Sequence, residues 1–534
     1  MKRKLLTALL CGALMLTSLA GCGQGAGNQS GTSAGGESAV KDELVFVNYR
    51  DIRDLNPHLY AGEMYAQSIL YDTLVSNTSE GYVGCLAEDW TISEDGRTYT
   101  FNIRDGVTFS DGTPCDANAI LANFNAILEN RERHTWLEMM NLLVGVSAPD
   151  DDTFVIEMSE PYYPMLTELA CIRPFAMISP NCMIDGSTKD GVNGYIGTGP
   201  YVLTDFVTDE YAVFERNENY WGEKPAIQKI TVKVIPDNQT RIMALENGEI
   251  DLIFGKNMLD ADAISQYVDS DKFTVGLSDP TSTRHIVLNT THDILGDKSV
   301  RQALQHATNR QAISEGIFYG LEPAADTLYS TTVPYCDVDL EPYAYDADEA
   351  ARLLDEAGWT MGSDGVRAKD GQKLALDLLY NSDSVTEKTI SEYLQSEYLK
   401  LGISLNIHGE EEQSYRDNMK AGNFDMVFNI CWGMPYDPQS SLAAMRAPVY
   451  GDYAAQQGLE DKAEIDQAIT DILTSTDETK RQELYTFVLT RLHEDAVYLP
   501  LTFETNKALY TSDLKGVHFG TDQYDVDFAS MYFE

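Results

Sequence analysis

The chain has 534 residues and a formal net charge of −46 at pH 7, with 38 Lys and Arg against 84 Asp and Glu. A chain of this length needs more than one hydrophobic core, so we expect two or more lobes. The acidic composition argues against nucleic acid as a partner, because the sequence has no basic stripe that could neutralise phosphates.

The first residues have the pattern of a secretory signal. Basic residues at positions 2–4 precede an apolar run over residues 5–20, and small residues follow it. The run is short for a membrane-spanning helix, and its small-residue end suits peptidase cleavage. The sequence therefore predicts a signal peptide over residues 1–21.

A lipid anchor is predicted directly after the signal peptide. The tetrad Leu-Ala-Gly-Cys at residues 19–22 resembles a bacterial lipobox, which implies that Cys22 is diacylated and becomes the mature N-terminus. Gly and Ser dominate the rest of residues 22–40, a composition typical of a flexible tether. We expect the folded part to begin near Lys41.

Strands and helices alternate through the folded part. Residues 98–104 alternate polar with apolar side chains, which predicts a half-buried strand, and Asp105-Gly106 predicts a turn after it. Residues 229–235 show the same alternation, and a helical segment then leads to another strand over residues 250–254. This strand–helix–strand order predicts an α/β architecture.

Two further helices have recognisable ends. Apolar residues recur at helical spacing over residues 300–307, where Asp297 or Ser299 is placed to cap free N–H groups. A second helix is predicted over residues 346–357, followed by Gly358 where a left-handed C-terminal cap needs a glycine.

A stiff aromatic loop follows a covered strand late in the chain. Residues 424–430 are apolar enough for a covered strand, and one glycine and two prolines in residues 431–438 prevent both helix and ladder. Ligands bind at strand ends in open α/β sheets, although large aromatic side chains more often pack than bind. Trp432 and Tyr436 are therefore candidates for either role.

Catalytic motifs are absent from the sequence. GxSxG, HExxH, GxxxxGK[ST] and GxGxxG do not occur, and the eight histidines form no close ligand cluster. We expect a binding protein and keep an enzyme acting on a metal chelate or peptide as a remote alternative. Among the scattered cysteines, Cys171 and Cys182 are near enough in sequence to suggest a local bridge.

Four segments together resemble family 5 extracellular solute-binding proteins of ABC importers. The longest is the run Leu-Ala-Glu-Asp-Trp to Asp-Gly-Thr-Pro at residues 86–114, and residues 197–201, 216–225 and 345–359 support it. Within that family the chain most resembles nickel-binding proteins, on four shorter segments. These are residues 130–136, 172–175, 432–438 and 456–459.

The resemblance implies a two-lobed α/β periplasmic-binding-protein fold with a hinge. By analogy, lobe one covers residues 41–283 and the C-terminal return 505–534, and lobe two covers residues 284–504. The same resemblance implies ABC permease and ATPase partners, a monomer, and an extracytoplasmic protein anchored to the cell membrane by its lipid. We expect ligand to be enclosed between the lobes.

The family's ligand site can be placed on this chain residue by residue. Two arginines match those that hold the carboxylates of a small organic chelator around the metal, through paired charge-assisted hydrogen bonds. Five aromatic or apolar residues match the wall of the same cleft, which would exclude water and sandwich a planar chelate or imidazole. The predicted site consists of Arg133, Arg173, Trp136, Trp432, Tyr436, Tyr60 and Met64.

Two positions depart from the nickel-binding pattern. Tyr450 stands where nickel binders often supply a histidine to the metal, and Gln439 stands where a close relative has histidine. A neutral phenol is a poorer ligand for Ni²⁺ than imidazole. No metal ligand of the chain is therefore certain: either the chelator fills every metal position, or the cargo has changed.

Two kinds of cargo follow from the resemblance. Peptide-binding relatives keep an aspartate where this chain has Pro435, and Asp437 lies two residues later. Without that carboxylate the α-ammonium group of a peptide would be buried unpaired, at a cost of several kcal/mol. The sequence thus favours a complex of nickel or another transition metal with a small carboxylate or histidine-type chelator, and a dipeptide or oligopeptide is the alternative.

Overall fold

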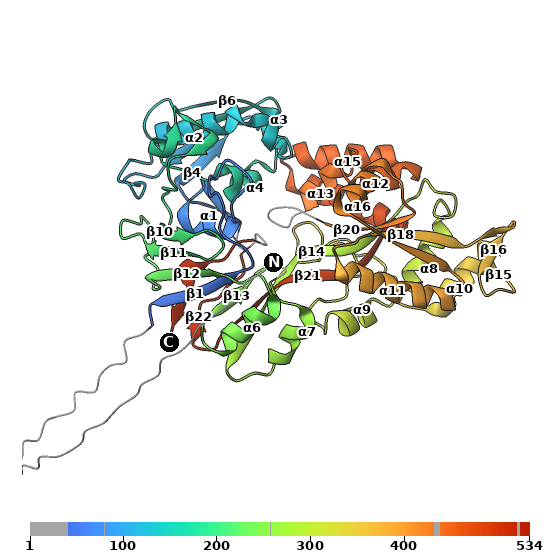
Figure 1. The fold of residues 1–534 in the computed structure, drawn as a ribbon. Coiled ribbons are helices and arrows are strands. Elements are labelled where there is room, and N and C mark those ends of the chain that lie inside the picture. Colours follow the sequence, from blue (N-terminus) through green and yellow to red (C-terminus); the bar gives the residue numbers. More distant parts are fainter. Residues whose placement is uncertain (1–40, 79–80, 257, 432–437, 521–523) are drawn as a thin grey trace, which may run out of the picture. The chain divides into compact units, whose positions relative to one another are not determined.

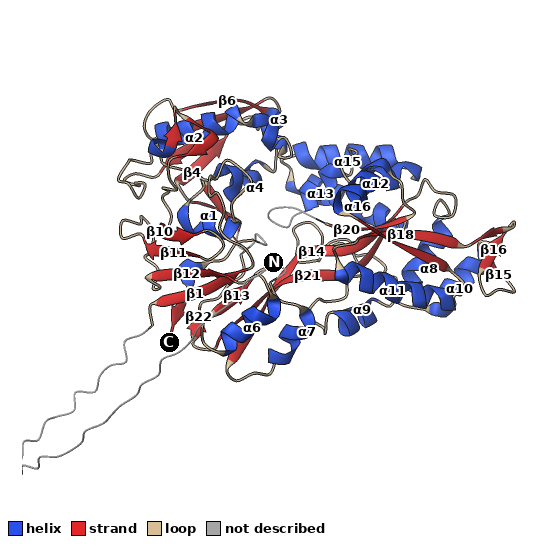
Figure 2. Cartoon of the chain, in the orientation of Figure 1, coloured by secondary structure: helices blue, strands red, loops and turns tan. Residues whose placement is uncertain are grey.

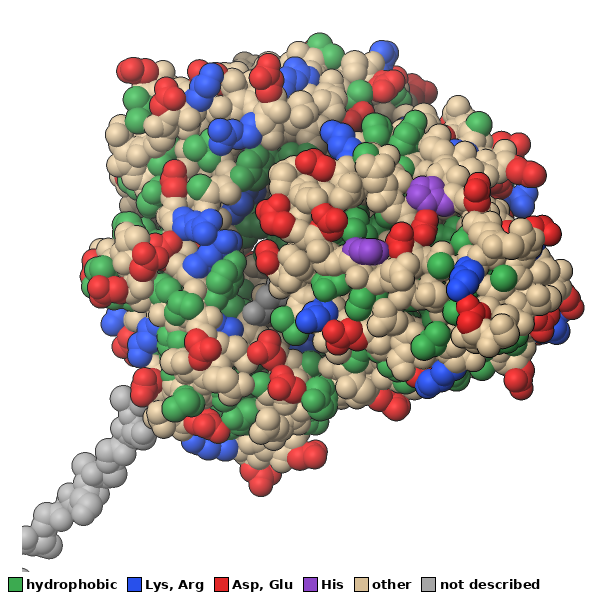
Figure 3. All heavy atoms as spheres, turned by 45° about the vertical axis from the view of Figure 1, so that its right-hand side comes forward, with side chains coloured by type: hydrophobic (Ala, Val, Ile, Leu, Met, Phe, Trp, Pro, Cys, Tyr) green, Lys and Arg blue, Asp and Glu red, His purple; other side chains and the backbone are tan. Residues whose placement is uncertain are grey.

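The structure is a computed structural model that describes residues 41–534 except for residues 79–80, 257, 432–437 and 521–523. Residues 41–534 form one compact unit. Among these described residues, no helix has the length and apolar character needed to cross a membrane. Asp and Glu side chains are spread over the face drawn in Figure 3, with Lys and Arg between them.

A ten-stranded sheet forms the centre of this unit (Figure 1). In spatial order its strands are β10 (Tyr201–Val207), β11 (Tyr211–Arg216), β12 (Lys229–Val234), β1 (Glu43–Asn48), β13 (Leu252–Phe254), β21 (Tyr498–Thr511), β14 (Phe273–Leu288), β20 (Met426–Ile430), β18 (Ala375–Asn381) and β19 (Ser404–Glu410). Strands β12, β1 and β13 run parallel to one another, as do β20, β18 and β19.

Two long antiparallel strands join these two parallel groups. Strand β14 has 16 residues and β21 has 14, and they pair along most of their length. Their register shifts between Leu277 and Pro280, between Pro280 and Ser282, and between Arg284 and His285. Such irregularities bend a ladder and increase its twist locally, so we expect the sheet to bend at this pair.

Helices pack beside both groups of strands (Figure 2). Near β10–β13 lie α1 (Met64–Leu70), α5 (Ile172–Phe175), α6 (Asn238–Glu246) and α7 (Ala261–Ile264). Beyond β14 lie α8 (Lys298–Ala307), α9 (Arg310–Ile317), α10 (Ala347–Glu356), α11 (Val385–Lys400), α12 (Glu412–Ala421), α13 (Pro438–Ala444), α14 (Gly451–Ala455), α15 (Lys462–Thr474) and α16 (Glu478–Glu494).

A separate antiparallel sheet of four strands is inserted after α1. Its order is β4 (Ala87–Ile92), β5 (Thr98–Ile103), β7 (Thr153–Met158) and β6 (Leu143–Ser147). It packs with α2 (Ala117–Glu129), and the same region holds the 3₁₀ turn η1 (Arg131–His134), α3 (Glu138–Leu142) and α4 (Met165–Leu169).

Small ladders and turns complete the described chain. The ladders are β2 (Val75–Thr78) with β3 (Gly81–Gly84), β8 (Met183–Ile184) with β9 (Ser187–Val192), β15 (Thr360–Met361) with β16 (Arg367–Lys369) and β17 (Gln372–Lys373), and β22 (Leu514–Lys515) with β23 (Tyr532–Phe533). The remaining 3₁₀ turns are η2 (Pro180–Cys182), η3 (Ser265–Tyr267), η4 (Gln456–Gly458) and η5 (Phe528–Ser530).

The buried apolar residues form five clusters that divide along the chain. Three clusters draw on residues 44–273 and 508–533, together with Leu321. The other two draw on residues 286–501. The first group uses both ends of the described chain and the second group uses its middle, and the strands β14 and β21 contribute residues to both groups.

The elements predicted from periodicity are confirmed. Strand β5 occupies the first predicted strand, and β12, α6 and β13 follow in the predicted order. Asp237 and Asp297 cap α6 and α8 by accepting backbone N–H groups, and Gly358 follows α10 at φ +88°. The six cysteines among the described residues are buried thiols that form no disulfide with one another, so the suggested bridge between Cys171 and Cys182 is not formed.

Candidate functional site

An aromatic group joins the loop before α1 to the turn after α2. The hydroxyl of Tyr60 lies 2.6 Å from Nδ1 of His134 and accepts a 2.7 Å hydrogen bond from Nε1 of Trp136. The ring centroids of Tyr60 and Trp136 are 6.3 Å apart in an edge-to-face arrangement. Side chains 74 and 76 residues apart in sequence thus form one group.

The local sequence explains why His134 and Trp136 reach this position. Asp116 caps α2 by accepting the N–H of Ala119, and the helix ends at Asn130, whose N–H bonds back to the last turn. The chain then tightens into the 3₁₀ turn η1, which ends at His134. A tight turn at a helix end changes the direction of the chain within one turn, so the residues after α2 face the loop that carries Tyr60.

Arg173 lies beside the aromatic group and is buried. Its Nε and one terminal nitrogen donate to Oε1 of Gln67 at 3.0 and 2.9 Å, and that nitrogen also donates to the carbonyl of Gly62 at 2.6 Å. Its Cζ lies 5.9 Å from the ring centroid of Tyr60. Gly62 is needed here, because a Cβ at this position would lie 2.4 Å from the carbonyl oxygen of Asp54.

Arg133 differs from Arg173 in its surroundings. Its side chain is exposed, and it makes no hydrogen bond or ion pair with the described part of the chain. Its charge still acts on the aromatic group, because it contributes to the pKa shifts of both His134 and Tyr60. An exposed guanidinium whose side chain has no carboxylate partner among the described residues is available for an anionic ligand.

Burial keeps the aromatic group electrically neutral. Burial, assisted by the nearby charge of Arg133, lowers the pKa of His134 to about 4. Burial raises the pKa of Tyr60 to about 12, against opposing contributions from Trp136 and Arg173. At neutral pH the imidazole and the phenol are therefore both uncharged, and the arginines carry the charge of this region.

Arg173 and Met64 line a cavity of about 720 Å³. Its walls come from β1, the loop into α1, the segment around Phe254 and the C-terminal return. Arg50 and Glu63 form a 2.5 Å ion pair at this wall, so part of its charge is already balanced. The volume suits a small molecule, since ligand pockets are typically about 300–1,000 Å³.

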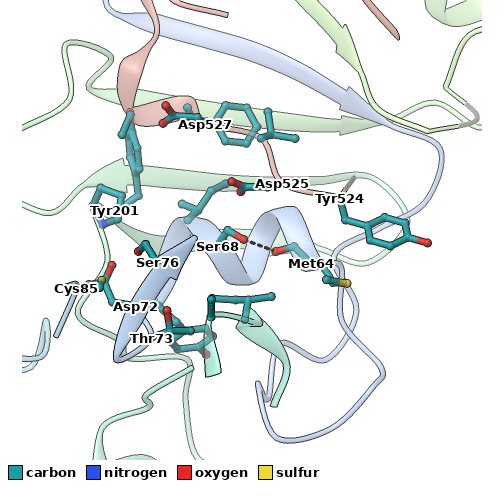
Figure 4. Close-up of a pocket in the computed structure, with 18 of the residues that line it drawn as sticks. Met64, Ser68, Asp72, Thr73, Ser76, Cys85, Tyr201, Tyr524, Asp525 and Asp527 are labelled. Carbon is teal, nitrogen blue, oxygen red and sulfur yellow. Dashed lines mark hydrogen bonds between the residues drawn. The ribbon is translucent and has the colours of Figure 1, made fainter. Parts of the chain in front are cut away.

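A second cavity, of about 320 Å³, lies along α1 and shares Met64, Tyr524 and Val526 with the first. Figure 4 shows Met64 and Tyr524 towards one end of it, and Asp72 and Cys85 towards the other. Asp72 accepts hydrogen bonds from Thr198 and from the indole of Trp221. Burial raises the pKa of Asp72 despite those donors.

The other predicted site residues fall elsewhere or outside the described residues. Tyr450 is half-buried and directly precedes α14, and it is not among the residues that line these two cavities. Gln439 is buried in α13, where its Oε1 accepts from Arg481 at 3.3 Å. Trp432, Tyr436 and the lipidation site Cys22 lie outside the described residues.

His134 and Gln67 are the residues that the sequence reasoning missed. His134 stands inside the segment that carried the nickel-binding resemblance, between Arg133 and Trp136, and that adjacency was the available signal. Gln67 lies on α1 one turn after Met64, and nothing in its sequence context marks it. Within the part of the chain that the structure describes, no group of three or more His, Cys, Asp or Glu could hold a metal ion.

The fold and this region define a two-lobed solute-binding protein: a large mixed sheet crossed by two long strands, with cationic and aromatic side chains at a small-molecule cavity. The chain belongs to the bacterial extracellular solute-binding proteins, family 5, whose model matches residues 81–452. Its members bind solutes outside the cytoplasm, so the chain is an extracytoplasmic binding protein and not an enzyme.

Individual relatives agree with this family. The nickel-binding periplasmic protein of Escherichia coli is 41% identical over 499 residues, which cover 92% of this chain and 95% of that protein. The crystal structure of NikA from Brucella suis in complex with Fe(III)-EDTA is 43% identical with a TM-score of 0.89, covering 92% and 100%. The dipeptide-binding protein of Escherichia coli is 27% identical, covering 89% and 91%.

Proposed function

We propose that this protein captures a complex of nickel, or another transition metal, with a small carboxylate or histidine-type chelator and delivers it to an ABC permease driven by an ATPase. The observation that carries the proposal is the cavity with Arg173 at its wall and the Tyr60–Trp136 pair beside it. A buried guanidinium next to flat rings suits an anionic chelate, because exclusion of water strengthens the ionic contact.

The similarity to a nickel-binding periplasmic protein at 41% identity, and to a protein whose structure holds the chelate Fe(III)-EDTA at 43% identity, supports a metal chelate over a peptide. Peptide capture is the second candidate, supported by the dipeptide-binding relative at 27% identity. The two differ in charge requirement: a chelate needs cations for its carboxylates, whereas a peptide also needs a carboxylate for its ammonium group. Asp437, the one substitute for that carboxylate in the loop, lies outside the described residues.

The proposal includes two lobes that close on the ligand. Lobe one would be residues 41–283 with 505–534, lobe two residues 284–504, and β14 with β21 would form the hinge. The separation of the hydrophobic clusters along the chain supports this division. Ligand that contacts both lobes only when they are closed shifts the population towards the closed state.

Anchoring and assembly belong to the same proposal. Cleavage after residue 21 and lipidation of Cys22 would hold a monomer at the outer face of the cell membrane through the tether over residues 22–40. One acyl-bearing residue with two chains suffices for stable anchoring, because two lipid chains bind membranes far more tightly than one.

The first test is to identify what the protein carries. Residues 41–534, which form one compact unit, are purified from rich medium without chelators and measured by native mass spectrometry and elemental analysis. The proposal expects nickel or another transition metal together with a small polycarboxylate or histidine. A bound short peptide without metal would replace it with peptide uptake.

A further inference from the structure

Three side chains form a directed chain of hydrogen bonds at the candidate site. The indole Nε1 of Trp136 can only donate, so the hydroxyl of Tyr60 is the acceptor of their 2.7 Å bond. The one proton of that hydroxyl is then free to be donated to Nδ1 of His134 at 2.6 Å. The order of donors is therefore Trp136 to Tyr60 to His134.

This order fixes the form of the imidazole. Nδ1 of His134 must be unprotonated to accept from Tyr60, so the neutral ring carries its proton on Nε2. Burial, which lowers the pKa of His134, favours this neutral form. The hydrogen bonds among Trp136, Tyr60 and His134 therefore assign one position to each of their indole, hydroxyl and imidazole protons.

The other nitrogen of His134 shows that this arrangement has a cost. Nε2 is fully buried and has no hydrogen-bond partner among the described residues. A buried donor without a partner is unfavourable, and native structures rarely keep one without a compensating role. An apolar side chain would pack in this place without that cost. The reason for a histidine here is therefore its Nδ1 atom, which faces the hydroxyl of Tyr60.

The hydrogen bonds of Tyr60 also affect the exposed side chain of Trp136. Its side chain is 43% exposed, so packing alone does not fix the indole, and the bond to Tyr60 restricts its rotation. The hydroxyl of Tyr60 is occupied on its donor side, so Tyr60 presents its ring more than its proton to a ligand. Arg173 lies against the same ring.

We propose that His134 is a positioning residue: its Nδ1 holds the hydroxyl of Tyr60, which holds the indole of Trp136 as a fixed wall for a flat anionic ligand. This rests on the proposed function only in assigning the ligand. The positioning itself depends only on hydrogen bonds within the chain. A side chain locked before binding loses less conformational entropy on binding.

The test compares two substitutions of the same residue. His134→Asn keeps an acceptor oxygen at the place of Nδ1, and His134→Leu removes it. The protein has five tryptophans, so selective ¹⁵N-indole labelling gives a simple spectrum in which the Trp136 signal is assigned by Trp136→Phe. Spectra and indole hydrogen exchange are recorded without ligand, and Kd is measured with nickel–tricarboxylate and nickel–histidine complexes.

We expect His134→Leu to shift the Trp136 indole signal, to speed its hydrogen exchange by about tenfold or more, and to weaken nickel-complex binding about five- to tenfold, with His134→Asn close to wild type. Tyr60→Phe removes the hydroxyl while keeping His134, and should give the same indole change if His134→Leu does not fold. An unchanged Trp136 signal in the folded Leu and Phe variants would overturn the positioning role.

Ligand binding separates this inference from the proposed function. If the indole signal moves as expected while Kd for both nickel complexes stays constant, the positioning is correct and Trp136 is not a wall of the nickel-complex site. If wild-type protein binds neither complex but binds a dipeptide, the proposed cargo is wrong, and the indole measurement still decides whether His134 positions Trp136.

Discussion

The two arginines of the candidate site differ in burial and in the hydrogen bonds that their side chains make. The side chain of Arg133 is exposed and makes no hydrogen bond or ion pair with the described residues, whereas the side chain of Arg173 is buried and donates to Gln67 and Gly62. Loss of a guanidinium therefore has separable effects at the two positions. Substitution of Arg133 should change ligand affinity alone. Substitution of Arg173 should change both ligand affinity and the stability of the fold.

We predict that Arg133→Ala weakens binding of an anionic nickel chelate about tenfold or more while the melting temperature stays constant. Arg173→Ala should weaken binding at least as much and also lower stability by about 1–3 kcal/mol, because Gln67 and Gly62 lose their donor. Calorimetric titration and thermal unfolding measure the two effects. Arg97→Ala, which removes an exposed arginine paired with Asp95, is the control.

The arginine clamp would be discarded if Arg133→Ala and Arg173→Ala both bound the chelate as tightly as the wild type. Equal losses of stability in the two variants would contradict the difference in burial.

Tyr450 decides whether the protein itself supplies a metal ligand. Imidazole is a better donor than a neutral phenol for late first-row divalent metals. If this position reaches the metal, Tyr450→His should raise affinity for incompletely chelated Ni²⁺ by about tenfold or more. Tyr453→His, on the following helix α14, is a matched control that should leave affinity unchanged. No gain in either variant would mean that Tyr450 does not reach the metal.

At the scale of elements, the contacts of Tyr163 join the segment before α4 to α15 and α16. The N–H of Tyr163 donates to the carbonyl of Leu473 at 3.0 Å, and its hydroxyl donates to Glu478 at 2.6 Å. Cζ of the fully buried Arg481 lies 3.4 Å from the centroid of the Tyr163 ring. Tyr163 belongs to the range predicted for lobe one, and its three partners belong to the range predicted for lobe two.

These contacts link the two predicted lobes directly and so should favour the closed state. A cation over a ring contributes about 0.5–2 kcal/mol, and a hydrogen bond to a charged group about 1.5–3 kcal/mol. We predict that Tyr163→Ala increases the radius of gyration of the free protein in X-ray scattering and weakens ligand binding several-fold, because less of the protein is in the competent state. Tyr163→Phe should have a smaller effect.

Tyr99→Phe is the control for Tyr163, because it removes the hydroxyl of a buried tyrosine that donates to Tyr162 within one core. It should change neither scattering nor affinity. A Tyr163→Ala protein with the scattering profile and Kd of the wild type would show that these contacts do not hold the lobes together.

The contrast between predicted and unpredicted elements has a physical basis. Strand β5 and helices α8 and α10 were found because period-two and period-3.6 patterns and caps are local. Strand β14 was not predicted, since it contains Ser278, Asp279 and Pro280, and proline cannot donate to a ladder. The register shift beside Pro280 accommodates it, which depends on the partner strand β21.

The candidate site divides in the same way. The resemblance to the family proposes Arg133, Arg173 and Trp136 as site residues, because a resemblance is a property of short segments. The role of His134 depends on a hydrogen bond to a side chain 74 residues earlier, and no local pattern encodes that distance. The positions of Trp432 and Tyr436 lie outside the described residues and stay predictions.

At the scale of the whole molecule, the β14–β21 pair carries a cluster of charges where the sheet changes course. Arg284 on β14 pairs with Glu504 on β21, and Glu322 lies 3.6 Å from the same guanidinium. Lys256 approaches Glu504 at 3.4 Å, and Lys507 approaches Glu322 at 3.2 Å. These groups line a cavity of about 610 Å³, so the proposed hinge is held by ion pairs as well as by the ladder.

The charge of Glu504 makes this cluster sensitive to acid. Burial raises the pKa of Glu504, but attraction from Arg284 and Lys256 and a hydrogen bond from Ser282 outweigh it and hold the pKa well below the ordinary 4.5. A carboxyl whose pKa is lowered on folding stabilises the native state above its unfolded pKa. Its contribution is therefore present at neutral pH and is lost as the pH falls below about 4.5.

Glu504→Gln tests this contribution against the behaviour of an exposed pair. We predict that the variant unfolds about 3–5 kcal/mol more easily at pH 7, because Arg284 and Lys256 lose their buried partner. Its free energy of unfolding should fall less steeply than that of the wild type below pH 4.5, by the effect of one carboxyl. Denaturant titrations at pH 7, 4.5 and 3 measure both quantities.

Glu218→Gln, which breaks an exposed pair with Arg216 and Lys224, is the control and should follow the wild type. Parallel pH profiles for Glu504→Gln and wild type would mean that the cluster does not stabilise the strand pair, and the hinge would then depend on the β14–β21 ladder alone.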